Sequence, residues 1–232
     1  MAKIKIARQN EPGANKKLAN LFLFLFLVRL AFLIVTVVLF GAETVLMSRR
    51  SKATSGDLNE FLRYLNFIST YDQIRNICAW VTVGILLVQL AVFYLLSPYE
   101  KNFVSAIGLG IFTVVCSIAA IFLTDVNVGL AILLAILEGG AKIGYTYFYY
   151  YGCSNVTKSR DGELADLWKK LFTLYVISLG LRILSVVLVL SANGAAEASM
   201  AVLILSVFTT ALPIIILYRE VKYLPQTIKV LK

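Results

Sequence analysis

Four charged side chains stand inside long apolar runs of this sequence, where they could carry chemistry. Glu138 and Lys142 are four residues apart, so on a helix they share one face in the acid-before-base order that stabilises an ion pair. Arg29 and Arg182 each stand alone in another run. A charge at membrane depth disfavours insertion by about 2.5–3.5 kcal/mol, so such a residue commonly faces protein or a wet cavity and marks a functional site.

Three cations and one acid suit the binding of an anionic solute or a lipid headgroup. The expected substrate-binding residues are Arg29, Glu138, Lys142 and Arg182. Counted from the cytoplasmic ends of their spans, the three basic residues fall at one level, with Glu138 one turn deeper, where it could instead carry a coupling proton. The alternative interpretation is structural: Glu138 pairs with Lys142 or an arginine, and the other basic side chains extend toward the headgroups.

The absence of histidine excludes several classes of site, among them Ser-His-Asp and Cys-His catalysis and histidine metal centres. Cys78, Cys116 and Cys153 are far apart in sequence and each lies in or beside an apolar run, which is typical of single buried thiols. Paired carboxylates do not occur within the apolar runs. We therefore expect no catalytic residue, no metal and no cofactor, and a protein that is not an enzyme.

The composition is that of an integral membrane protein. Of the 232 residues, 59% are hydrophobic and 15% are charged, and the mean hydropathy is +0.83. A soluble domain has about 45–50% apolar and about 25% charged residues. The apolar residues form continuous runs of about 20, the length of a helix that crosses a bilayer. Because the runs are continuous and do not alternate with polar residues, they indicate helices and not barrel strands.

We predict an all-α, polytopic membrane protein with six transmembrane helices. A basic tail over residues 1–17 precedes a single transmembrane domain over 18–232. The predicted spans are about 18–47, 74–96, 103–123, 128–152, 172–190 and 200–218. Polar linkers over 48–72 and 154–170 each carry a short amphipathic segment, over 57–68 and 162–171 respectively. We expect both segments to lie on the membrane surface as interfacial helices. Residues 219–232 are expected to form a second basic tail.

The distribution of lysine and arginine predicts that both termini are cytoplasmic, and the membrane is expected to be the plasma membrane. With six spans, both terminal segments and the 154–170 linker fall on one side, and they hold most of the basic residues. The net charge of +9 then fits basic loops that face anionic lipid and does not call for nucleic acid. The discordant segment is 48–72, whose basic residues would lie on the outer side.

The two linkers resemble each other, which suggests an inverted repeat of three spans plus three. The matching pairs are Ser48 with Ser154, Lys52 with Lys158, Gly56 with Gly162, Leu58 with Leu164 and Leu65 with Leu171. Since three spans separate the linkers, the two halves would be inverted in the membrane, as in many secondary transporters. Alternatively, two unrelated interfacial helices share a pattern.

The predicted function is binding or transport of a small anionic or amphiphilic solute through the charged cluster, because charge lies in the middle of the spans. The alternative is a non-enzymatic membrane subunit or regulator of a larger complex, docking through glycine-bearing helix faces. Besides the bilayer, the expected partners are an anionic small molecule or lipid headgroup, and a membrane protein or further copies of this chain, which could also form a pore. No nucleic acid is expected.

Overall fold

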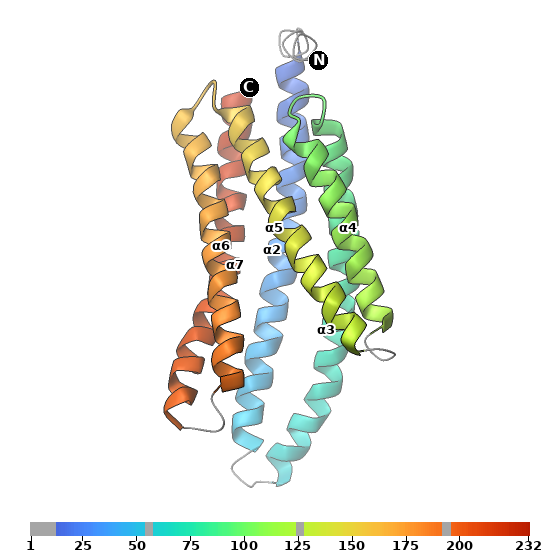
Figure 1. The fold of residues 1–232 in the computed structure, drawn as a ribbon, viewed down its shortest axis with the longest axis vertical. Helices are drawn as coiled ribbons and strands as arrows, with labels where there is room; N and C mark the ends of the chain where they lie inside the picture. The colour runs from blue at the N-terminus through green and yellow to red at the C-terminus, as the bar shows by residue number, and fades with distance from the viewer. Residues whose placement is uncertain (1–12, 54–57, 124–127, 192–195) are drawn as a thin grey trace.

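A computed structural model describes residues 13–53, 58–123, 128–191 and 196–232, and every regular element within them is an α-helix. The helices are α2 (Ala14–Ala53), α3 (Leu58–Leu96), α4 (Asn102–Leu123), α5 (Val128–Thr157), α6 (Gly162–Ser191) and α7 (Ala196–Leu231). They alternate in direction, so α2 starts and α7 finishes at the same end of the bundle, which we call the terminal end (Figure 1). The predicted all-helical fold is confirmed for these residues.

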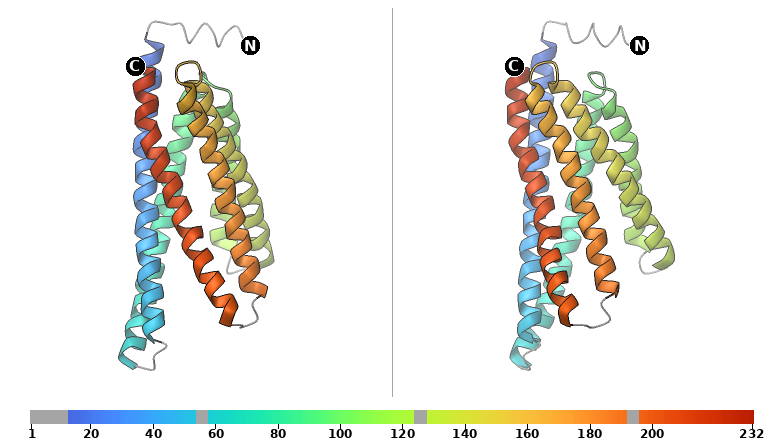
Figure 2. Two further views of the ribbon diagram at one scale, coloured as in Figure 1. Left: turned by 90° about the vertical axis from the view of Figure 1, so that its left-hand side faces the viewer. Right: turned by 60° about the vertical axis from the view of Figure 1, so that its left-hand side comes forward.

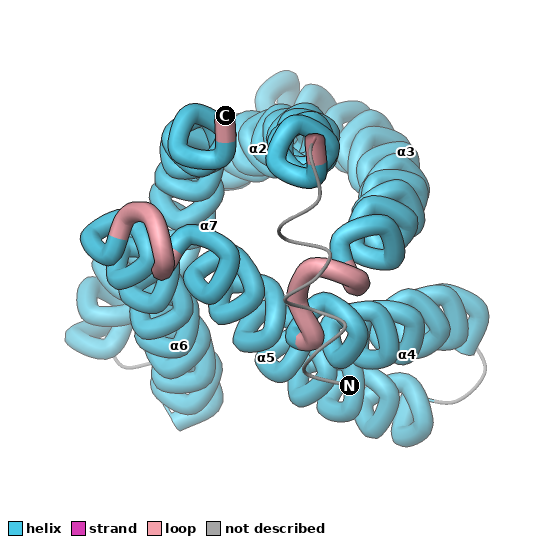
Figure 3. The backbone as a smooth tube through the Cα atoms, turned by 90° about the horizontal axis from the view of Figure 1, so that it is seen from above, coloured by secondary structure: helices cyan, strands magenta, loops and turns pink. Residues whose placement is uncertain are grey.

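The helices close into a ring. α2 packs against both α3 and α7, and the chain continues around the ring through α4, α5 and α6, each in contact with its sequence neighbours. Figure 3 shows this arrangement from the terminal end. Closure depends on the contact between α2 and α7, which brings the first and last described helices together. Space inside the ring is therefore accessible to side chains from every helix.

Local sequence sets the helix boundaries. Gly13 has a φ of 92°, a left-handed conformation that glycine adopts without a Cβ clash, and α2 begins at the next residue. Pro98 follows closely on the end of α3, where its missing N–H cannot continue the helix. Asp161 caps α6, because its Oδ1 accepts a hydrogen bond of 2.9 Å from the backbone N–H of Leu164.

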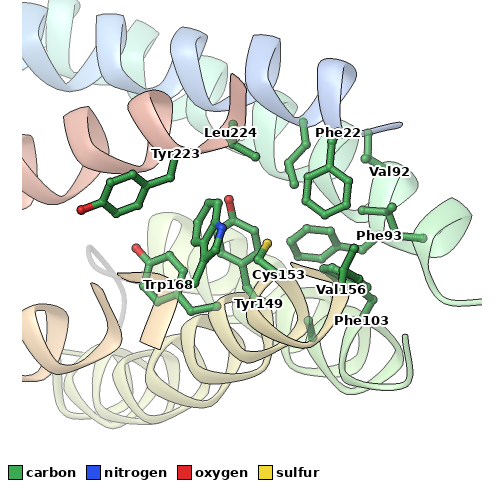
Figure 4. Packing of buried hydrophobic residues seen from close by; sticks show 14 of the residues in the cluster. Phe22, Val92, Phe93, Phe103, Tyr149, Cys153, Val156, Trp168, Tyr223 and Leu224 are labelled. Atoms are coloured by element: carbon green, nitrogen blue, oxygen red, sulfur yellow. The ribbon is translucent and has the colours of Figure 1, made fainter. Parts of the chain in front are cut away.

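The densest packing lies near the terminal end, where the antiparallel order gathers the starts of α2, α4 and α6 and the ends of α3, α5 and α7 (Figure 4). The largest fully buried side chains include Phe22, Phe93, Phe103, Tyr149, Tyr150 and Trp168. The Phe93 ring centroid lies 5.3 Å from those of both Phe103 and Tyr149. Such aromatic pairs add to the free energy of apolar burial, so this end of the ring is firmly closed.

Toward the opposite, far end the helices diverge. In Figure 2, α7 runs beside α2 near the terminal end and moves away from it toward the far end. Pro213 lies inside α7, where the loss of one backbone hydrogen bond favours a kink. Large apolar side chains are exposed along this half, including Ile34, Val37, Val38 and Phe40 of α2. An exterior of this kind is suited to lipid and unsuited to water.

Three helical segments among the described residues are long and apolar enough to cross a membrane: Ala14–Arg50, Leu58–Leu96 and Asn102–Ala119. These three segments agree with the predicted class, a helical membrane protein. Six spans, the orientation of the termini and the type of membrane stay predictions.

The predicted interfacial helices are not separate elements. Residues 58–72 form the first turns of α3 and residues 162–171 form the first turns of α6, each continuous with the apolar run that follows. Neither junction contains proline or glycine, so the helix propagates through it at little further cost in entropy. The paired leucines of the proposed repeat also have unlike surroundings: Leu58 and Leu65 are exposed, whereas Leu164 and Leu171 are buried.

Candidate functional site

A cavity of about 530 Å³ lies inside the ring, and all of the described helices contribute to its lining. It begins at the aromatic core, where Tyr149 and Tyr150 line it, and extends along α5 as far as Glu138. That stretch of α5 is about 18 Å long at about 1.5 Å per residue. Most of the lining is apolar or aromatic with a few polar groups, which is the usual construction of a small-molecule site.

An ion pair between Arg29 of α2 and Glu220 of α7 lies at the terminal end of the cavity. The Arg29 Nε donates to Glu220 Oε2, and the Glu220 side chain is fully buried. A charge buried to this extent is stable only when it is paired and hydrogen-bonded. The pair therefore depends on the contact between α2 and α7 and in turn stabilises it.

Two further helices contribute to this ion pair. Tyr150 of α5 donates its hydroxyl to Glu220 Oε1, and Arg29 Nη1 donates to the side-chain oxygen of Gln89 of α3 at 3.3 Å. The guanidinium carbon of Arg29 also lies 5.3 Å from the centroid of the Tyr149 ring, within the range of a cation–π interaction. One charged pair thus links four helices across the ring.

A second ion pair lies farther from the terminal end. Lys142 Nζ is 2.5 Å from Glu138 Oε1, and Ser117 of α4 donates its hydroxyl to the same oxygen at 2.7 Å. The Glu138 side chain is 16% exposed and that of Lys142 is 49% exposed, so this pair is much less buried than the first. Because of this exposure the pair adds little to the stability of the fold.

Two tyrosine hydroxyls beside the first pair have no hydrogen-bond partner among the described residues. They belong to Tyr145 and Tyr149, one turn apart on α5, and both side chains are more than nine-tenths buried and line the cavity. The side-chain nitrogen of Gln89 is likewise buried and unpartnered within this part of the chain. Buried polar groups nearly always have a partner, so each of these donors requires an explanation.

The structure places three of the predicted site residues on one cavity: Arg29, Glu138 and Lys142. It does not bring Arg29 to the level of Lys142. Arg29 contacts Tyr149, which is seven residues, or about 10 Å, along α5 from Lys142. Arg182 belongs to α6, but its side chain lies outside the described residues.

The sequence interpretation missed Glu220, because residues 219–232 were expected to form a basic tail. They are the last turns of α7. The buried residues of this stretch are Glu220, Tyr223, Leu224, Thr227 and Leu231. Their spacing of three and four residues is the signature of a helix with one buried face, and it could have revealed the continuation of the helix.

No cluster of three acidic, cysteine or histidine side chains that could hold a metal ion occurs among the described residues. Cys78, Cys116 and Cys153 are buried free thiols. The polar groups that line this cavity are therefore the two ion pairs, tyrosine hydroxyls, and the hydroxyls of threonine and serine residues.

Comparisons with protein-family models, with curated proteins and with solved structures gave no match for this chain. Its function is therefore inferred from the cavity itself.

Proposed function

We propose that this chain is a six-span membrane protein whose cavity binds a small amphiphilic or anionic solute and carries it across the bilayer. The observation that carries the proposal is the cavity, which is lined by every helix of the ring and holds buried charge at its terminal end. An intramembrane charge that faces a cavity is a common mark of a substrate pathway. Both described ion pairs are internally neutral, which favours a solute with a large apolar part.

Unequal packing of the two ends of the ring supports transport over storage of a bound ligand. Aromatic side chains close the ring at the terminal end, whereas α7 diverges from α2 toward the far end (Figure 2). A carrier must present its site to one side at a time, and a ring closed at one end has this form. With cytoplasmic termini, as the positive-inside rule predicts, the cavity would open outward.

Binding can be tested with amphiphiles that share one tail. Octanoate, octylamine and octanol would be added to the purified protein in detergent, and the melting temperature would be measured. At a concentration of about 100 times its Kd, a bound ligand stabilises the folded state by about 2.7 kcal/mol. We expect at least one probe to stabilise the protein and to cross the membrane of liposomes that contain it.

The control variant fills the cavity. Ala79 of α3 lines it, so Ala79→Trp should abolish stabilisation and flux. Ala91→Trp, on the exposed face of the same helix, should leave both unchanged. If none of the probes stabilises the wild-type protein, or if stabilisation survives Ala79→Trp, the cavity is not the binding site.

Membrane topology is tested separately. In a variant without the native cysteines, a single cysteine at Ser159 or at Ser55 would be treated with an impermeant thiol reagent on intact cells. Six spans with cytoplasmic termini predict labelling at Ser55 and protection at Ser159 until lysis. The inverted repeat requires the same pattern, because its two linkers must lie on opposite sides. Protection at both positions would contradict the six-span topology.

One observation favours a second candidate, a subunit of a larger membrane complex. The hairpin of α2 and α3 projects beyond the other helices at the far end (Figures 1 and 2). Its exposed apolar side chains include Leu58, Phe61, Leu62 and Leu65. A partner that covers this projection would copurify with the protein and be lost when two of these leucines are changed to serine. That result, together with no response to the amphiphiles, would favour the subunit.

A further inference from the structure

Two hydrogen-bond donors without acceptors belong to side chains that line the cavity, and a third belongs to Gln89, which contacts Arg29. The hydroxyls of Tyr145 and Tyr149 and the amide nitrogen of Gln89 are buried, and no described residue accepts a hydrogen bond from them. An unmade buried hydrogen bond destabilises a fold, so a cluster of such groups at one place is uncommon. Both tyrosine side chains line the cavity, so a small movement of either one would bring its hydroxyl into contact with a ligand.

The two tyrosine rings are held in place by packing. The Phe93 ring centroid lies 5.8 Å from that of Tyr145 and 5.3 Å from that of Tyr149. Gly110 of α4 lies against Tyr145 so closely that an added Cβ would be 3.1 Å from the ring. Packing of this kind restricts the two rings, which reduces the entropy lost when a ligand binds.

Positive charge lies beside these hydroxyls. The guanidinium of Arg29 is 5.3 Å from the centroid of the Tyr149 ring and also lines the cavity. It donates to Glu220 and Gln89, and a guanidinium has five N–H donors, so its capacity exceeds these two bonds. The same subsite thus offers phenol and guanidinium donors.

A subsite made of donors selects a ligand group made of acceptors. An ionised carboxylate accepts at both oxygens and donates nothing, which matches this set. A dianion such as phosphate fits less well, because Glu220 already balances the charge of Arg29 and would repel a second negative charge. An amine would have to compete for the Glu220 carboxylate, whose two oxygens already accept hydrogen bonds from Arg29 and Tyr150.

We propose that Tyr145 and Tyr149 bind the carboxylate of an amphiphilic monocarboxylate, with Arg29 providing the adjacent positive charge. The apolar tail would lie along Leu86 and Leu90 of α3 and Ile216 of α7, which line the same cavity. This assignment rests on the proposed function and narrows its solute to one chemical class. Such an acid could come from the bilayer, as a fatty acid, or from water, as a small organic acid.

The test compares three tyrosines of α5. The Kd for octanoate would be measured by calorimetry in detergent for Tyr145→Phe, Tyr149→Phe and Tyr150→Phe, together with the melting temperature of each protein without ligand. A hydrogen bond to a charged group accounts for about tenfold in Kd, so the first two variants should each bind octanoate about tenfold more weakly. Their melting temperatures should be unchanged or higher, because these hydroxyls have no partner in the described structure to lose.

Tyr150→Phe is the structural control, because its hydroxyl donates to Glu220. It should lower the melting temperature of the ligand-free protein. Tyr147→Phe, at an exposed ring, should change neither quantity. A loss of octanoate binding with no loss of stability is a result that a purely structural role for Tyr145 and Tyr149 would not produce.

The outcomes separate this assignment from the proposed function. If Tyr145→Phe and Tyr149→Phe bind octanoate as the wild type does, or if octylamine and octanol bind as tightly as octanoate, the carboxylate subsite is wrong and the cavity remains a binding site. If none of the amphiphiles binds, both the carboxylate subsite and the proposed function are wrong. Benzoate distinguishes the source: tighter binding of octanoate indicates a lipid-derived acid, and tighter binding of benzoate indicates a water-soluble one.

Discussion

Arg29 and Glu220, 191 residues apart in the sequence, form the ion pair that joins the first described helix of the ring to the last. The hydroxyl of Tyr150 and the side-chain oxygen of Gln89 complete its hydrogen bonds, so α2, α3, α5 and α7 meet at this pair. Because contact between α2 and α7 closes the ring, the same pair that lines the cavity also holds its terminal end together.

Removing one member of this pair should destabilise the protein strongly. Arg29→Gln or Glu220→Gln leaves the other charge buried without compensation, a loss of about 3–5 kcal/mol in the free energy of unfolding. The double variant should lose less than the sum of the two single changes, because it contains no orphaned charge. Unfolding in detergent, followed by circular dichroism, measures all three. Additive losses would show that the two side chains do not interact in solution.

Gly110 of α4 lies in close contact with α3 and α5, whereas the nearby Gly108 does not. A Cβ at Gly110 would approach Leu90 Cδ2 to 2.4 Å and the Tyr145 ring to 3.1 Å, whereas a Cβ at Gly108 would meet nothing within 4 Å. We therefore expect Gly110→Ala to lower the melting temperature. Gly108→Ala should be neutral or stabilising by up to about 1 kcal/mol, since alanine favours the helix. Equal effects of the two substitutions would contradict this packing.

The sequence predicted the helices well where length and apolarity were the signal, and less well at their boundaries. The predicted spans all fall within observed helices, because a continuous apolar run has few alternatives to a helix. Residues 57–68 and 162–171 were assigned to surface helices because they are amphipathic. These residues continue into the following apolar runs because no proline or glycine interrupts the helix at the junction. The change from polar to apolar residues was instead interpreted as a helix boundary.

The site residues that could be predicted from the sequence are the charged residues that lie within apolar runs. Arg29, Glu138 and Lys142 were visible for this reason, and all three line the cavity. Glu220 stands among other polar residues, and its burial results from helices that are distant in sequence. Glu220 also changes the net charge of the site, because it is a counterion for Arg29 that comes from outside the predicted spans.

The buried indole of Trp168 offers a spectroscopic test of the closed end. Its Nε1 donates a 3.1 Å hydrogen bond from α6 to Thr227 Oγ1 of α7. Thr227→Val removes the acceptor at constant shape and should destabilise the protein by about 1–3 kcal/mol, whereas Thr227→Ser keeps the acceptor and should lose less. With Trp80 replaced by Phe, Trp168 is the remaining tryptophan, and its emission should shift to shorter wavelength in Thr227→Val alone. Identical spectra for both variants would exclude this bond.

Glu138 and Lys142 should affect ligand binding in opposite directions. If an anion binds at Tyr145 and Tyr149, about 10 Å from the Glu138–Lys142 pair along α5, each charge of the pair acts on it through Coulomb forces. At an effective dielectric constant of about 20, a unit charge at that distance changes Kd by up to about tenfold. Glu138→Gln should therefore tighten octanoate binding and Lys142→Gln should weaken it.

Stability should respond little to either substitution. The Lys142 side chain is about half exposed, and an exposed ion pair contributes about 0–1 kcal/mol. The amide of Glu138→Gln can still accept the hydrogen bond from Ser117. Calorimetric titration and melting curves of the same samples measure both quantities. A charge that acts on a bound anion must have opposite effects on Kd when its sign is opposite. If instead the two variants both lose stability and bind octanoate as the wild type does, the pair holds α5 to α4 and does not act on the ligand.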